Sequence, residues 1–102
     1  MARKIVLLCA GGLSTGMLVK KMEKYAQSIG YDCTISAYGK ELAKDKASDA
    51  DIVLLGPQIR FAYDEIKKEI PNVPIEVMGM QDYGMQKADL FINRCKEVLG
   101  DQ

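Results

Sequence analysis

The sequence predicts an α/β fold in which helices cover both faces of a four-stranded parallel sheet. Four short aliphatic runs alternate along the chain with longer segments whose apolar residues recur at helical spacing. Strands that alternate with helices indicate βαβ units, whose parallel strands are joined by right-handed crossovers. We expect one domain over residues 1–102, because this length fits a single hydrophobic core.

The first half of the chain contains two predicted strands and two predicted helices. The first strand covers Arg3–Leu8, and a glycine-rich turn leads from it to a helix that begins near Thr15. Gly30 stands where such a helix commonly ends. The apolar side of this helix is formed by Leu18, Met22, Tyr25, Ala26 and Ile29. A second strand is predicted over Cys33–Tyr38, and a short helix over Glu41–Ser48.

The second half repeats the alternation. Asp51–Gly56 contains a third strand, and the turn Gly56-Pro57-Gln58 follows it. The next helix ends at Pro71 and has an apolar face formed by Ile59, Ala62, Ile66 and Ile70. A fourth strand over Ile75–Met78 precedes a loop through Met80–Gly84. The last helix has its apolar side formed by Ala88, Phe91, Ile92, Cys95, Val98 and Leu99. The complete pattern predicts a flavodoxin-like three-layer sandwich.

The amino-acid composition excludes several classes of function. Fourteen basic and fourteen acidic residues cancel, so no charge excess predicts binding to nucleic acid. The longest aliphatic run near the N-terminus, Ile5–Leu8, is too short for a signal peptide or a membrane span, and we therefore expect a cytoplasmic protein. The chain has no histidine, which excludes Ser-His and Cys-His nucleophile pairs and mixed His/Cys zinc sites. We expect neither a cofactor nor a metal.

Cys9 is the candidate nucleophile. It follows the first strand and opens a loop of small residues that leads into a helix. Backbone amides of such a loop and of the helix N-terminus favour a thiolate over a thiol, and they suit the oxygens of a phosphoryl group. A free cysteine is often simply a small buried residue, and Cys33 and Cys95 are interpreted as such because each fits an apolar pattern without a glycine loop.

Two segments of the chain resemble signatures of a known family. The segment Val6-Leu7-Leu8-Cys9-Ala10-Gly11-Gly12-Leu13-Ser14-Thr15 resembles the active-site segment of the B subunits of the lactose/cellobiose/chitobiose branch of the bacterial sugar phosphotransferase system. The segment Ala50-Asp51-Ile52-Val53-Leu54-Leu55-Gly56-Pro57-Gln58-Ile59 is similar to the second signature of that family. Pro74-Ile75-Glu76-Val77 and Tyr83-Gly84 follow in the family's order, so the resemblance covers nearly the whole chain.

The resemblance implies a phosphoryl relay in sugar uptake. Cys9 would carry the phosphate as phosphocysteine, and the cradle would be formed by Ala10, Gly11, Gly12, Leu13, Ser14 and Thr15. Pro57 and Gln58, together with Asp82 and Tyr83, would border the site and shape the docking of partners. The phosphate would come from a phosphohistidine of an A subunit and pass to a disaccharide bound by the membrane-embedded C subunit. The protein would lie in the cytoplasm at the transporter, and it would be a monomer when isolated, because no long apolar stripe remains after the core is assigned.

Two other readings of the same residues are open. Low-molecular-weight phosphatases resemble this fold and also place a cysteine at the end of the first strand. Their loop has an arginine six residues after the cysteine, where this chain has Thr15, and their general acid is an aspartic acid next to a proline, a pair absent from this sequence. The second reading is a regulatory docking domain without catalysis.

Overall fold

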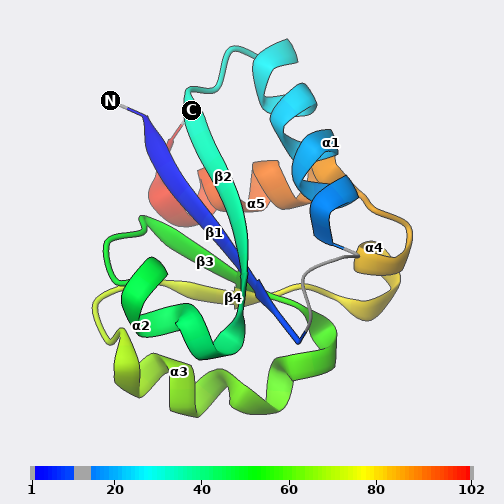
Figure 1. Ribbon diagram of the computed structural model, residues 1–102. Coiled ribbons are helices and arrows are strands. Elements are labelled where there is room, and N and C mark those ends of the chain that lie inside the picture. Colours follow the sequence, from blue (N-terminus) through cyan, green and yellow to red (C-terminus); the bar gives the residue numbers. More distant parts are fainter. Residues whose placement is uncertain (1, 11–14, 102) are drawn as a thin grey trace.

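The predicted α/β sandwich is confirmed. The computed structural model describes residues 2–10 and 15–101 of the chain. Four parallel strands form the middle layer in the order β2-β1-β3-β4 (Figure 1). The strands are β1 (Arg3–Cys9), β2 (Cys33–Gly39), β3 (Ile52–Leu55) and β4 (Ile75–Val77). Because all of them run in the same direction, they end at one edge of the sheet, which we call the carboxyl edge.

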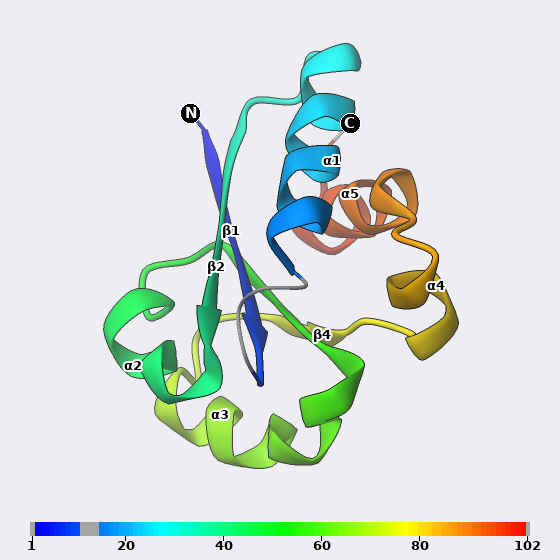
Figure 2. The same cartoon turned by 45° about the vertical axis from the view of Figure 1, so that its right-hand side comes forward.

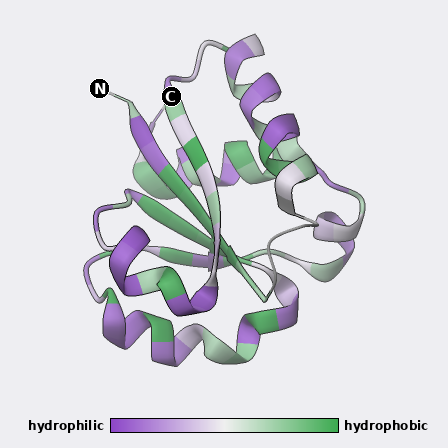
Figure 3. Cartoon of the chain, viewed as in Figure 1, coloured by the Kyte–Doolittle hydropathy of each residue, from purple (hydrophilic) through white to green (hydrophobic). Residues whose placement is uncertain are grey.

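The two central strands are apolar on both faces. Residues Ile5–Cys9 of β1 and Ile52–Leu55 of β3 are buried throughout, as expected for parallel strands covered by helices on each side. Figure 3 shows these strands as hydrophobic over most of their length, while the helices are hydrophilic on their outer sides. Leu8 of β1 stands opposite Leu55 of β3, and Cys9 stands opposite Gly39 of β2.

Helices α1 (Thr15–Ser28) and α5 (Ala88–Leu99) cover one face of the sheet (Figure 2). The predicted apolar side of α5 is buried at Ala88, Phe91, Ile92 and Cys95. In α1, Leu18, Met22 and Ala26 are buried, but Ile29 is 41% exposed and its predicted place in the core is wrong. The helix ends at Ser28, and Gly30 turns the chain with a φ of +70°, so Ile29 lies beyond the last helical turn.

The other face is covered by two pairs of short helices. The first pair is η1 (Lys40–Leu42) and α2 (Ala43–Lys46), and the second is η2 (Pro57–Ala62) and α3 (Tyr63–Glu69). The predicted apolar face of the second pair is buried as expected: Ile59, Ala62, Ile66 and Ile70. The chain is not one continuous helix there, because its first part is a 3-10 helix with a kink at Ile59.

The segment Met80–Gly84, predicted as a loop, forms the short helix α4. Gly79 precedes it in an extended conformation, and its carbonyl accepts a hydrogen bond from the backbone N–H of Tyr83 at 2.8 Å. None of the α4 residues is buried, so the helix contributes no apolar periodicity that a sequence pattern would reveal.

Candidate functional site

Cys9 is the last residue of the central strand β1, at the carboxyl edge of the sheet. Its side chain is only 3% exposed. The thiol is directed at the neighbouring strand, where the carbonyl oxygen of Tyr38 lies 3.9 Å from Sγ and accepts a weak hydrogen bond from it. The thiol therefore has to leave this contact before its sulfur can attack a group presented from solvent.

The predicted phosphate cradle falls only partly on described residues. Ala10 is exposed next to Cys9, and Thr15 is the first residue of α1, whose first turn contains no acidic residue. Gly11, Gly12, Leu13 and Ser14 lie outside the described residues, as does the side chain of Thr15. The partial positive charge at the N-terminus of α1 is therefore not offset by a carboxylate of its own first turn. The phosphate cradle itself stays a prediction.

The turn after β3 packs directly against Cys9. The backbone N–H of Gly56 donates a hydrogen bond of 2.8 Å to the carbonyl oxygen of Leu8, the residue before the cysteine. A methyl group placed on Gly56 would lie 3.3 Å from the Cβ of Cys9 and 3.1 Å from the Oε1 of Gln58. The backbone of Gly56, at φ −60° and ψ 144°, suits any residue, so its glycine provides space for Cys9 and Gln58 and not an unusual conformation.

The sequence singled out Pro57 and Gln58 but not Gly56. The amide oxygen of Gln58 lies beside Gly56, in the turn that packs against Cys9, whereas Pro57 is buried. A glycine directly after a buried strand, at the carboxyl edge where ligands bind in open α/β sheets, is the signal that was available for Gly56.

Asp82 and Tyr83 come from α4, the third element at this edge. The Asp82 carboxylate lies 3.8 Å from the Nζ of Lys87, and it also lines a cavity of about 200 Å³ between β4 and α5. Tyr83 is half-buried and packs against the core under α1 and α5. Both residues therefore lie on the side of the molecule formed by β4 and α5, and their place at the border of the site stays a prediction.

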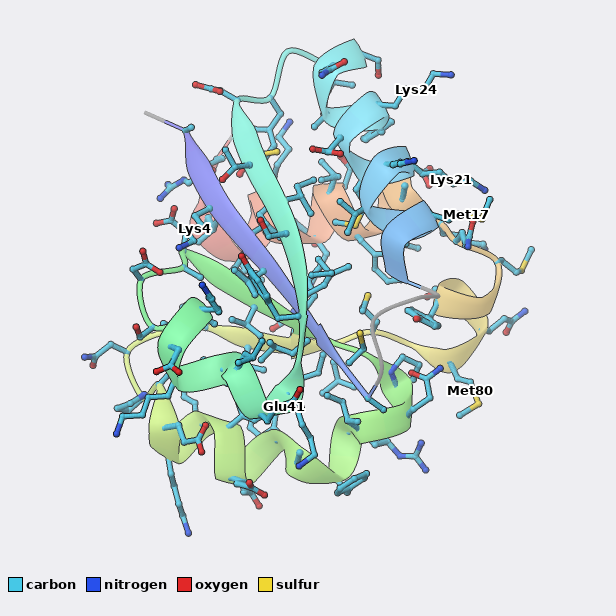
Figure 4. The ribbon with its side chains drawn as sticks, viewed as in Figure 1. Lys4, Met17, Lys21, Lys24, Glu41 and Met80 are labelled. Atoms are coloured by element: carbon cyan, nitrogen blue, oxygen red, sulfur yellow. The ribbon has the colours of Figure 1, made fainter. Side chains whose placement is uncertain are left out.

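Large apolar side chains are exposed on three elements that begin at the carboxyl edge. Met17 belongs to α1, Phe61 to η2 and Met80 to α4, and Met85 follows α4; each is exposed by 62% or more. Figure 4 shows Met17 and Met80 pointing outward on the same side of the molecule. We call these four residues the apolar rim. The sequence predicted no such surface, because exposed methionines among polar residues form no stripe of helical spacing.

Within residues 2–10 and 15–101, no three cysteine or carboxylate side chains gather in a way that could hold a metal ion. In the same part of the chain, none of the helices has the length and apolar character needed to cross a membrane.

Cys9 ends a central strand and lies beside the turn at Gly56. This arrangement defines a class of small α/β proteins with a thiol at the ligand-binding edge of the sheet. The particular family follows from comparison with known proteins. The family described as "PTS system, Lactose/Cellobiose specific IIB subunit" matches residues 4–94. The chain belongs to this family of B components of the phosphotransferase system, which relay phosphoryl groups in sugar uptake.

Three similar proteins support this assignment. The oligo-beta-mannoside-specific EIIB component of Bacillus subtilis is 47% identical over 102 residues, which cover 98% of this chain and 99% of that protein. The solution structure of the cellobiose-specific phosphotransferase IIB component of Borrelia burgdorferi has a TM-score of 0.82 and 30% identity, and the match covers 98% of this chain and 94% of that one. A lactose-specific EIICB component of Staphylococcus haemolyticus is 27% identical over 77 residues, 76% of this chain and 13% of that longer protein.

Proposed function

We propose that the thiolate of Cys9 is the group that carries phosphate in this relay. The observation that supports this most is the position of Cys9 at the carboxyl end of the central strand, beside the Gly56 turn and shortly before α1 in the chain. The chain contains no histidine, so its nucleophile must be of another type. Thiolates are strong nucleophiles, and a phosphoryl group on sulfur can be passed on without a metal or a cofactor.

The transfer has two steps that balance in protons. In the first, the Cys9 sulfur attacks the phosphorus of a phosphohistidine on the A component; the S–P bond forms, the N–P bond breaks, and the proton lost by the thiol ends on the imidazole. In the second, a hydroxyl oxygen of the disaccharide bound by the membrane C component attacks the phosphorus. The S–P bond breaks, and the hydroxyl proton ends on the sulfur. We assign the backbone amides of residues 10–15 to the phosphoryl oxygens in both steps.

Docking on the apolar rim prepares the thiol for this reaction. The Tyr38 carbonyl accepts a hydrogen bond from the protonated thiol but would repel a thiolate, and Cys9 is almost completely buried. Partner binding must therefore accompany a turn of the side chain towards the incoming phosphate. The rim suits this task because methionine side chains are flexible and polarisable, which allows one surface to receive both the A and the C component in turn.

We propose that the partners hold the chain at the inner face of the membrane. By its name, the similar EIICB protein joins a C and a B component in one chain. We propose the same partnership here between separate chains. This protein would then be cytoplasmic, peripheral to the transporter and monomeric when isolated. The names of the similar proteins mention different sugars, so we leave the choice of disaccharide to the C component.

The test follows the phosphate through the relay. Purified chain is incubated with a phosphorylated A component, and the phosphate is located by mass spectrometry. The native chain and Cys33→Ser should each gain one phosphate, while Cys9→Ser should gain none, because serine without a general base is a poor nucleophile. A phosphate on Cys9→Ser, or its loss in Cys33→Ser, would contradict the assignment.

The same phosphoprotein separates the relay from the two alternatives. A relay intermediate should persist in buffer without an acceptor, because Thr15 stands where a phosphatase has its phosphate-gripping arginine. Rapid hydrolysis of the phosphocysteine, or turnover of an aryl phosphate, would favour the interpretation of the chain as a phosphatase. A docking domain would take up no phosphate at all.

A further inference from the structure

The carboxamide of Gln58 lies beside the nucleophile. The Oε1 atom of Gln58 and the Cβ atom of Cys9 each lie within 3.3 Å of one point, the place where Gly56 lacks a side chain. The amide oxygen of Gln58 and the Cβ of Cys9 therefore border the same small space next to Gly56. The carbonyl oxygen of Leu8 lies 3.5 Å from the same point, so the backbone of β1 also borders this space.

The backbone holds Gln58 at this place from both sides. Pro57 and Ile59 are buried, and Pro57 fixes its own φ angle by its ring. The carbonyl of Gly56 accepts a hydrogen bond of 3.1 Å from Ile59, and the Arg60 guanidinium donates one of 3.3 Å to the carbonyl of Pro57. Gln58 is exposed between these anchors, yet its amide oxygen lies back beside Gly56. The backbone position of Gln58 is therefore set before any partner binds.

A carboxamide has the right chemistry for a phosphoryl group that must be held and then released. Its NH₂ group provides two hydrogen-bond donors without a positive charge. A charged, bidentate donor would hold the phosphate more tightly and would also stabilise the attack of water on it. A neutral donor adds orientation without that gain in hydrolysis.

We propose that Gln58 is a further catalytic residue of the relay, whose carboxamide NH₂ donates a hydrogen bond to an oxygen of the phosphoryl group on Cys9. The inference rests on the proposed function of Cys9. Gln58→Leu removes the donor and should slow phosphoryl transfer from the A component about 3- to 10-fold, the value of one neutral hydrogen bond. Gln58→Glu replaces the donor by a negative charge of similar shape and should slow transfer more, on the order of 100-fold.

The experiment compares transfer rates from one phosphorylated A component to the native chain, Gln58→Leu, Gln58→Glu and Gln27→Glu. The last variant makes the same charge change on the exposed side of α1 and should transfer at the native rate. Alkylation of Cys9 by iodoacetamide serves as a second readout, because this uncharged reagent requires the nucleophile but no phosphate ligand. Native alkylation with slow transfer is the expected result for Gln58→Leu, whereas the carboxylate of Gln58→Glu should slow alkylation as well, because a negative charge disfavours the reacting thiolate.

The outcomes separate the two proposals. If the native chain takes no phosphate on Cys9, the proposed function fails. If the native chain is phosphorylated there and the Gln58 variants transfer at its rate, the role of Gln58 is overturned and the relay stands. If alkylation of Gln58→Leu slows in parallel with transfer, Gln58 acts on the packing or exposure of Cys9, and its assignment as a phosphate ligand is overturned.

Discussion

Replacing Gly56 by alanine tests how closely the turn after β3 must fit the nucleophile. The added methyl group would meet Gln58 Oε1 at 3.1 Å, Cys9 Cβ at 3.3 Å and the Leu8 carbonyl oxygen at 3.5 Å. The first two distances are tighter than ordinary contacts between such atoms. Gln58 is the part that gives way, because its side chain is flexible and exposed, whereas Cys9 is fixed in the central strand.

Two opposing effects set the change in stability. Crowding a packed site by one methyl group costs about 1 kcal/mol when a flexible neighbour can move aside. Alanine also restricts the unfolded chain and adapts without strain to the φ and ψ of Gly56, which stabilises the fold by about 0.4–1 kcal/mol. The free energy of unfolding should therefore change by less than about 1 kcal/mol, while displacement of the Gln58 carboxamide should slow phosphoryl transfer several-fold.

Urea denaturation and the rate of transfer from a phosphorylated A component measure the two quantities separately. Gly84→Ala is the matched control, because a methyl group there would meet nothing within 4 Å. That variant should keep the native transfer rate. Native transfer in Gly56→Ala would refute the close fit, and a loss of stability beyond about 3 kcal/mol would show that Gln58 does not move aside.

Two further predictions concern pH. Burial raises the pKa of the Cys95 thiol from 9.0 to about 12, so the unfolded chain releases this proton at a lower pH than the folded chain. Above pH 9 this group should therefore lower the free energy of unfolding by about 1.4 kcal/mol per pH unit. In urea denaturation, Cys95→Ala should lose stability less steeply with rising pH than the native chain. An unchanged slope would contradict the effect of burial. Hydrogen bonds from Arg3 and Tyr31 lower the pKa of Asp101 to about 2, so their contribution to stability is present above pH 3.8 and is lost as the pH falls through about 2. Asp101→Asn should unfold at less urea than the native chain at neutral pH, with a smaller further loss on acidification; equal losses in both proteins would count against this network.

The sequence by itself determined the order of the strands and long helices and the buried faces of those helices, and it identified the candidate nucleophile. The apolar spacing of α5 predicted its buried residues, and a cysteine before two glycines identified the candidate site. These signals are local: helical periodicity needs only neighbours within a few residues, and the family signatures are continuous segments. The same reasoning missed α4, because a helix without buried residues leaves no pattern.

Only the tertiary structure decided what surrounds the thiol. The turn at Gly56 packs against Cys9 because Leu8 stands opposite Leu55, and this register brings the end of β3 next to the end of β1. The sequence could not give that register, since β1 and β3 are apolar on both faces and have no alternation that a shift by one residue would disturb. The Tyr38 carbonyl likewise meets the thiol through the pairing of β1 with β2. Contacts between atoms of different strands depend on how the strands align, and the packing of the helices on both faces of the sheet sets that alignment.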